Sequence, residues 1–141
     1  MNGDNVLTMA KSMRILKIMQ FAFGIHMAMV IFMAEYIRKG DVPVAQELYL
    51  GYMIVSIGLV ASFFFFRAKL TAPESALQQD PQDRVALGQR QKFHVFLLAI
   101  SEALVLFGFV VRFMGESVGH SIPFYMAGSI MLLLSTPRKL D

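Results

Sequence analysis

The sequence has no cysteine and few charged residues for its length. Without cysteine, the chain cannot form a disulfide, a CxxC redox motif, a thiolate metal site or a cysteine nucleophile. Charged residues make up only 16%, whereas hydrophobic residues make up 56% and the mean hydropathy is +0.56. This is more apolar material than a soluble domain of 141 residues needs for its core. The composition therefore indicates an integral membrane protein.

The net charge of +3 comes from basic residues that cluster in short segments beside the apolar runs. A basic chain can bind nucleic acid, but this placement is typical of residues that orient a membrane protein. Most of the basic residues lie before the first apolar run, in the connection 67–92 and at the C-terminus. The positive-inside rule therefore predicts a multi-pass protein of the cell inner or plasma membrane, with both termini in the cytoplasm and no nucleic-acid partner.

Four apolar segments predict the membrane helices, at about 15–36, 48–66, 93–113 and 121–136. A helix needs roughly 20 residues to cross about 30 Å of hydrocarbon. The first three segments meet this length, and the fourth is shorter, with Ser121 as a predicted cap. We expect an all-α fold, in which residues 1–141 form a single membrane domain and a bundle of four transmembrane helices.

The connection 67–92 contains a predicted helix start. Asp80 offers an acceptor side chain, Pro81 suits the first helical position, and Asp83 places a carboxylate in the first turn. Few helix breakers follow, so the third helix is predicted to run from about 81 to 114. It would begin in the cytoplasm and continue into the membrane as one rod.

The spacing of Thr71 and Glu74 predicts a further helix start in the same connection, because it matches a capping box. A charge-mixed segment of this kind is typical of a solvated helical stalk. It also suits a docking surface for a soluble partner, and the sequence leaves both interpretations open.

Two ionisable side chains, His26 and Glu102, are expected near the middle of the membrane. At about 1.5 Å per residue, they lie about 16 Å and about 14 Å from the cytoplasmic starts of their helices. Both helices run in the same direction, so the side chains can meet if the helices are neighbours, and such a pair can hold or exchange one proton near neutral pH. The alternative is a structural Glu102, hydrogen-bonded to a neighbouring helix with Ser101 or Ser56 as the supporting polar group.

The stretch AISEALVLFGFVV, residues 99–111, resembles the carboxylate-bearing helix of the proteolipid c subunits of rotary ATP synthases and V-type ATPases. In both, a small residue and an aliphatic-aromatic-glycine stretch follow a glutamate. The resemblance implies that Glu102 binds the proton or sodium ion that such rings carry. The preceding hairpin is similar in topology, and Gln89-Arg90-Gln91 resembles the Arg-Gln loop of that family.

These observations predict a proton- or cation-handling subunit of an energy-transducing or transport complex. The alternative is an accessory or scaffold subunit that packs against a larger membrane complex without ion chemistry of its own. In either case we expect contact with the lipid bilayer and assembly with other membrane proteins, as a homo- or hetero-oligomer. No acyl-transfer, phosphoryl-transfer or redox motif is present, so we predict no catalytic residues, no independent enzyme activity and no cofactor.

A copper alternative can be drawn on the first helix. His26, Met29 and Met33 lie on one face at helical spacing, and their nitrogen and thioether ligands suit Cu(I). Methionine is also an adaptable filler of apolar packing, and the chain has 11 of them. The main prediction therefore contains no metal. Glu35 and Arg112, near the outer ends of parallel helices, are predicted to form a structural ion pair.

Overall fold

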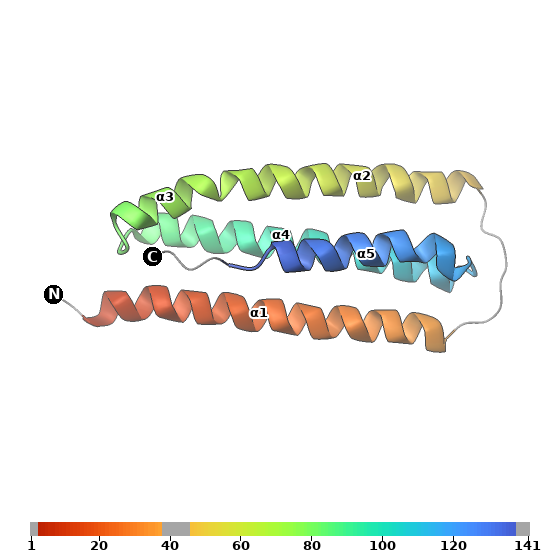
Figure 1. Cartoon of the computed structure of the whole chain (residues 1–141), viewed down its shortest axis with the longest axis horizontal. Helices are drawn as coiled ribbons and strands as arrows, with labels where there is room; N and C mark the ends of the chain where they lie inside the picture. The colour runs from red at the N-terminus through yellow and green to blue at the C-terminus, as the bar shows by residue number, and fades with distance from the viewer. Residues whose placement is uncertain (1–2, 38–45, 138–141) are drawn as a thin grey trace.

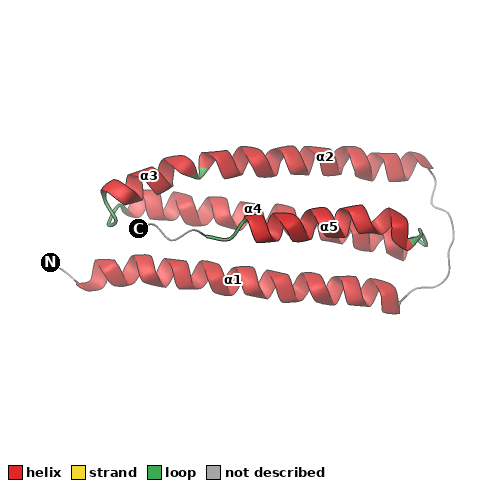
Figure 2. Ribbon diagram, viewed as in Figure 1, coloured by secondary structure: helices red, strands yellow, loops and turns green. Residues whose placement is uncertain are grey.

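The chain is helical, in a computed structural model that describes residues 3–37 and 46–137, with side chains from residue 9 onward. Figure 1 shows α1 and α2 on opposite sides of the pair formed by α4 and α5, and Figure 2 shows short turns between α3 and α4 and between α4 and α5. Helix α4 contacts every other helix, so it is the centre of the bundle. The all-α prediction is confirmed. The helices are α1 (Gly3–Tyr36), α2 (Gln46–Lys69), α3 (Thr71–Gln79), α4 (Arg84–Phe113) and α5 (Val118–Leu134).

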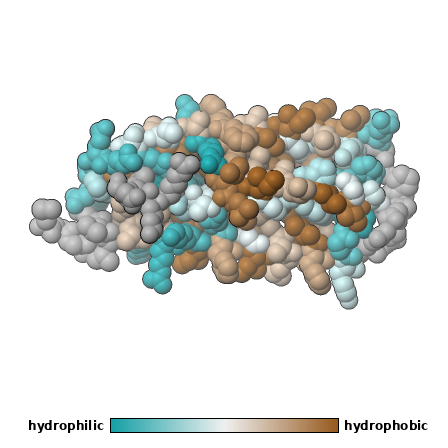
Figure 3. Space-filling model, viewed as in Figure 1, coloured by the Kyte–Doolittle hydropathy of each residue, from teal (hydrophilic) through white to brown (hydrophobic). Residues whose placement is uncertain are grey.

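Three stretches of helix are long and apolar enough to cross a membrane: Met9–Tyr36, Gln46–Gln79 and Arg84–Phe113. Hydrophobic side chains dominate the middle of the face in Figure 3, and hydrophilic ones gather toward its ends. Helix α5 is also apolar but has only 17 residues, about 26 Å of helix at 1.5 Å per residue. The structure therefore gives three candidate spans and one shorter apolar helix, and the crossing of the membrane by α5 stays a prediction.

Two glycines let α4 and α5 pack closely. A Cβ at Gly128 would lie 2.6 Å from both the Ser101 carbonyl oxygen and the Val105 side chain. A Cβ at Gly108 would lie 2.6 Å from the Tyr125 ring. Real Cβ atoms do not approach other atoms this closely, so the helix contact requires glycine at both positions. Small residues at helix interfaces serve this purpose in membrane proteins because they allow backbones to approach.

The buried apolar side chains form three clusters around α4. One joins it to α2 and α5, a second joins it to α1 and α5, and a third joins it to α3. Their burial is consistent with α4 as the central helix. The fully or nearly buried members are Phe63, Leu70, Leu97, Ile100, Leu104 and Met131 in the first cluster, Met27, Ala34, Val105 and Tyr125 in the second, and Leu77, Ala86 and Leu87 in the third.

The third predicted helix is confirmed as one unbroken rod, but it begins at Arg84 rather than at 81. Asp83 is the N-cap, and its Oδ1 accepts hydrogen bonds from the backbone N–H groups of Val85 and Ala86 at 2.9 and 3.1 Å. The predicted cap, Asp80, instead accepts from the Gln82 N–H within the preceding turn. The aspartate that satisfies two N–H groups of the first turn thus sets the boundary.

The other boundaries also differ from the sequence prediction. Helix α1 begins at Gly3 instead of 15, so it extends through polar residues that the hydropathy pattern had excluded. Helix α5 begins at Val118 after an N-cap at Ser117, so Ser121 lies inside the helix and is not its cap. Hydropathy marks the apolar part of a helix, whereas its ends depend on backbone hydrogen bonding.

The predicted connection 67–92 is mostly helical and folded against the bundle. The capping box is wrong, because the Thr71 hydroxyl donates to the Ala68 carbonyl at 2.8 Å and leaves the α3 N–H groups uncapped. Helix α3 buries Leu77 against the start of α4. The part of α4 before the apolar run is therefore packed against α3. Four basic residues used for the predicted orientation, Arg38, Lys39, Arg138 and Lys139, lie outside the described residues.

Candidate functional site

His26 and Glu102 meet across the α1–α4 interface. The Nδ1 atom of His26 contacts Oε1 of Glu102, and both residues lie inside candidate membrane spans. The predicted contact between them is confirmed. The His26 side chain is 54% exposed and that of Glu102 is 22% exposed, so the pair lies at the flank of the bundle and the histidine faces outward.

Buried neighbours hold the two helices at this contact. Met27 follows His26 on α1, and Val105 lies one helical turn after Glu102 on α4. Both are buried in the same cluster. The apolar packing therefore fixes the separation of the helices, and the polar pair lies at the edge of that packed surface.

The hydroxyls of the two serines predicted as supporting groups donate to acceptors other than Glu102. Ser101 is fully buried, and its hydroxyl donates to the Leu97 carbonyl on its own helix at 2.8 Å. Ser56 lies on α2, and its hydroxyl donates to the Tyr52 carbonyl at 2.7 Å. Each serine hydroxyl donates to a carbonyl of its own helix, as serines in apolar surroundings commonly do. Neither printed bond involves Glu102, so a supporting role for the two serines stays a prediction.

The histidine–carboxyl contact can carry one shared proton. With the proton on the carboxyl, both groups are neutral, and with the proton on the imidazole, they form an ion pair of no net charge. Neither form leaves an isolated charge in an apolar environment, which would be the costly state. The arrangement therefore permits proton transfer between the two groups. Because His26 is exposed, it connects the pair to the outer surface of α1.

A second polar cluster lies where α4 ends, which we call the Arg112 end. Arg112 is 2% exposed, and its Nε and Nη2 atoms donate to the two Glu35 carboxylate oxygens at 2.9 and 3.2 Å. Its Nη1 donates to the Glu116 carbonyl at 2.6 Å. The predicted Glu35–Arg112 pair is confirmed. The Glu116 carboxylate also contacts Nδ1 of His120 at 2.5 Å, a contact that sequence reasoning missed because it depends on the turn between α4 and α5.

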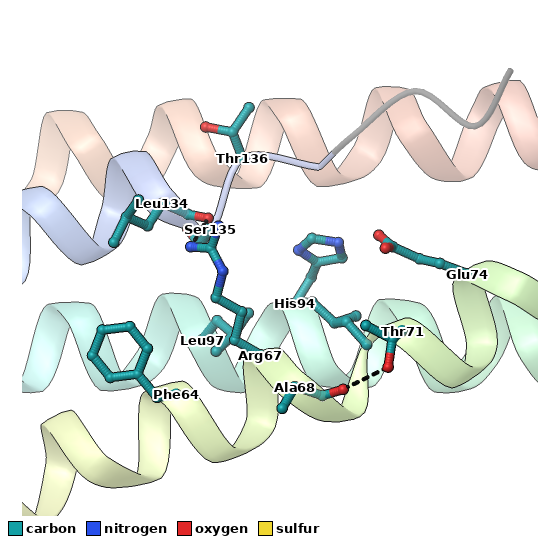
Figure 4. A pocket seen from close by; sticks show the side chains of 11 residues that line it. Phe64, Arg67, Ala68, Thr71, Glu74, His94, Leu97, Leu134, Ser135 and Thr136 are labelled. Atoms are coloured by element: carbon teal, nitrogen blue, oxygen red, sulfur yellow. Dashed lines mark hydrogen bonds between the residues drawn. The ribbon is translucent and has the colours of Figure 1, made fainter.

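A third polar group lies at the opposite end of the bundle, which we call the α3 end. Here a cavity of about 380 Å³ lies between α2, α3, α4 and the end of α5. His94 lines it and is 3% exposed, and neither of its ring nitrogens makes a hydrogen bond to the described part of the chain. Figure 4 shows the His94 ring between Glu74 and the segment that carries Ser135 and Thr136. Sequence reasoning placed His94 only at a helix end and did not predict this cavity.

The three residues of the copper alternative lie on α1, and all three are exposed. Met29 is 57% exposed and Met33 is 47% exposed. Over residues 3–37 and 46–137, no group of three histidine or acidic side chains could hold a metal ion. His26 makes its contact with Glu102 rather than with either sulfur. The copper site therefore gains no support from the arrangement.

The Gln89-Arg90-Gln91 stretch lies inside α4 and not in a loop. Arg90 is 1% exposed, with Nε 3.8 Å from a Glu74 carboxylate oxygen. Gln91 donates to the Ser12 hydroxyl on α1 at 2.6 Å. Both side chains tie neighbouring helices to α4. No family model, curated protein or solved structure matches the chain.

Proposed function

We propose that this chain is a small proton- or cation-handling subunit of a membrane transport or energy-transducing assembly, with His26 and Glu102 as the exchange site. The observation that supports this most directly is the contact between the two side chains across α1 and α4, within candidate membrane spans. Ionisable groups are costly in hydrocarbon and seldom occur there without a partner or a task. Their pairing lowers that cost while the pair holds one proton, on either side chain.

The proposed chemistry is reversible protonation of the pair. A proton that arrives from the exposed side of His26 converts the ion pair or the neutral pair into a singly positive one, and a proton that leaves restores it. Protonation of one side chain affects the other because the two are in direct contact. A cation could replace the proton at the carboxylate only when Glu102 is ionised.

The exposure of His26 favours a chain that works as a subunit of an assembly over a chain that works alone. A side chain that is 54% exposed at this depth faces either lipid or another protein. Lipid chains cannot hydrogen-bond to imidazole, whereas a polar group on a second helix can. We infer that a neighbouring chain covers this flank and exchanges the proton with His26. The resemblance of residues 99–111 to proteolipid c subunits, in which the carboxylate lies at a helix interface, is in keeping with this arrangement.

The second candidate is an accessory subunit without ion chemistry. The same exposed flank favours it, because a polar pair that anchors α1 to a partner helix would need the same neighbour. The two candidates differ in whether Glu102 gains and loses a proton during activity.

Labelling with dicyclohexylcarbodiimide tests the proposal. This reagent modifies accessible, protonated carboxyls in apolar surroundings. Native membranes that contain the full chain would be treated across a pH series, and the modified peptides would be quantified by mass spectrometry. We expect modification at Glu102 that falls as pH rises, and we expect Glu102→Gln to abolish it while the protein remains assembled.

Glu47→Gln is the matched control, because Glu47 is an exposed carboxylate in the first turn of α2. Its replacement should leave labelling of Glu102 unchanged. Labelling that does not vary with pH, or that is absent from a folded protein, would favour the accessory role. If Glu102 is labelled but Glu102→Gln leaves every proton-linked activity of the purified assembly intact, the exchange role is wrong.

A further inference from the structure

The cavity at the α3 end contains the features of an anion site. Arg67, His94 and Thr71 line it, as do the hydroxyl-bearing Ser135 and Thr136. His94 is the clearest sign of a ligand, because both ring nitrogens are buried and neither makes a hydrogen bond of normal geometry among the described residues, although the Ser135 backbone lies near the ring. A buried polar side chain is normally hydrogen-bonded, so an unsatisfied one that lines a cavity indicates a group that binds there.

The charge at this site favours an anion. Arg67 lies at the wall, and Arg90 lies one helical turn before His94 on α4. Glu74 is the one carboxylate among the described residues that line the cavity, and the Arg90 Nε atom lies 3.8 Å from its Oε1. Within the described part of the chain, Arg67 donates one hydrogen bond, from Nη1 to the Leu134 carbonyl at 2.7 Å. A guanidinium has five N–H donors, so others remain for a phosphate.

A separate apolar hollow lies between α2 and α5, farther from the α3 end. Its volume is about 210 Å³, and its walls include Ile57 and Val60 of α2 and Pro123 and Ala127 of α5. Ile57, Val60, Phe64 and Arg67 follow one another at helical spacing, so they share one face of α2. The part of α2 between Ile57 and Arg67 is about 15 Å long, which is half the hydrocarbon thickness of a bilayer.

We propose that the cavity and the hollow together bind one anionic phospholipid. Its phosphate would lie between Arg67 and His94 at the α3 end, and one acyl chain would follow the α2–α5 seam into the apolar hollow. The polar end and the apolar hollow are separated by the length of one leaflet, which a lipid matches and a free phosphate does not. This site is separate from the His26–Glu102 pair, so its test is independent of the proposed function.

Native mass spectrometry of the full-length protein in mild detergent tests the assignment. The protein would be incubated with equal amounts of phosphatidylglycerol and phosphatidylcholine that have identical oleoyl chains. We expect one phosphatidylglycerol to be retained preferentially. Arg67→Gln and His94→Phe should each reduce its retention about tenfold, the effect of losing one hydrogen bond to a charged group.

Lys69→Gln is the matched control. Lys69 lies two positions beyond Arg67, but its ammonium group is placed over the Phe65 ring, 5.4 Å from the centroid, and it does not line the cavity. Its loss should leave lipid retention unchanged. An equal effect of Lys69→Gln and Arg67→Gln would show nonspecific attraction to basic residues and would overturn the site. An absence of preference in the unmodified protein would overturn it as well.

A further variant tests the acyl-chain part of the proposal. Ala127→Leu should fill the hollow, reduce retention of the dioleoyl lipid and leave that of a dihexanoyl phosphatidylglycerol unchanged. If Arg67→Gln fails to fold, as judged by circular dichroism, Arg67→Lys replaces it and should keep most of the binding because it keeps the charge. Binding of inorganic phosphate alone with the same dependence on His94 would show that the ligand is not a lipid.

Discussion

Arg112 shows how a cation can be buried in so apolar a chain. Its guanidinium donates to both oxygens of Glu35 and to the Glu116 carbonyl. These bonds satisfy three of its nitrogen atoms and join α1, α4 and the turn before α5. The planar shape of arginine is required, because lysine cannot bind a carboxylate with two parallel hydrogen bonds.

Arg112→Lys should therefore destabilise the protein although it keeps the charge. We expect a loss of about 1–2 kcal/mol in the free energy of unfolding, from the lost bidentate bond and the carbonyl left without its donor. Thermal unfolding in detergent would measure it. Arg14→Lys, at an exposed position on α1, is the control and should have no measurable effect. Equal stability of the two variants would contradict this account.

At single residues, sequence reasoning succeeded where helix geometry alone decides position. His26 and Glu102 were predicted at similar depth from the rise per residue, and they are in contact. It could not show that Ser101 and Ser56 donate to carbonyls of their own helices, since a sequence does not reveal which partner a serine takes. The His94 cavity could not be predicted, because its walls come from four separate parts of the chain.

At the scale of the helices, the α4–α5 contact depends on a glycine. Gly128→Ala would place a Cβ 2.6 Å from the Ser101 carbonyl oxygen, so the helices would have to separate. We expect the free energy of unfolding to fall by about 1–3 kcal/mol, as in overpacked cores. Gly58→Ala is the matched control, because a Cβ there meets nothing within 4 Å. It should leave stability unchanged or raise it by up to about 1 kcal/mol through helix propensity.

Thermal unfolding of the two alanine variants under identical detergent conditions provides the comparison. If Gly128→Ala were as stable as Gly58→Ala, close backbone approach would not determine the packing of α4 on α5.

The start of α4 gives a further prediction. Asp83→Ala removes the acceptor for two backbone N–H groups. It should lower the free energy of unfolding by about 0.5–2 kcal/mol. Asp80→Ala, which loses one bond in the preceding turn, should cost less. Equal losses in urea unfolding would mean that the two aspartates share the cap. The sequence predicted this helix but favoured Asp80, because both aspartates have capping chemistry and only the backbone conformation distinguishes them.

For the whole molecule, the composition was sufficient to predict helices that cross a membrane, since hydrocarbon leaves few other ways to satisfy the backbone. The arrangement of the helices was not predictable. Gly108 and Gly128 make the close α4–α5 contacts, whereas a Cβ at Gly58 on α2 would meet nothing within 4 Å. Which small residue faces a neighbour depends on helix rotation, which hydropathy does not fix.

The predicted topology can be tested by labelling. Ser75 on α3 and Ser117 before α5 are both exposed and lie toward opposite ends of the bundle. The native chain has no cysteine, so single cysteines at these positions would be the only thiols. An impermeant maleimide should reach them from opposite sides of sealed membranes. Labelling of both cysteines from one side would mean that α4 does not cross the membrane.

The central claim is that His26 and Glu102 exchange one proton as a unit. The most direct measurement is a pH titration of the protonated-carboxyl band in infrared difference spectra of the protein in lipid, with Glu102→Gln to assign the band. We predict that the Glu102 band changes with pH and that His26→Gln alters this change, because the variant removes the imidazole that contacts the carboxyl group. A band that is absent throughout, or a titration that His26→Gln does not change, would contradict the claim.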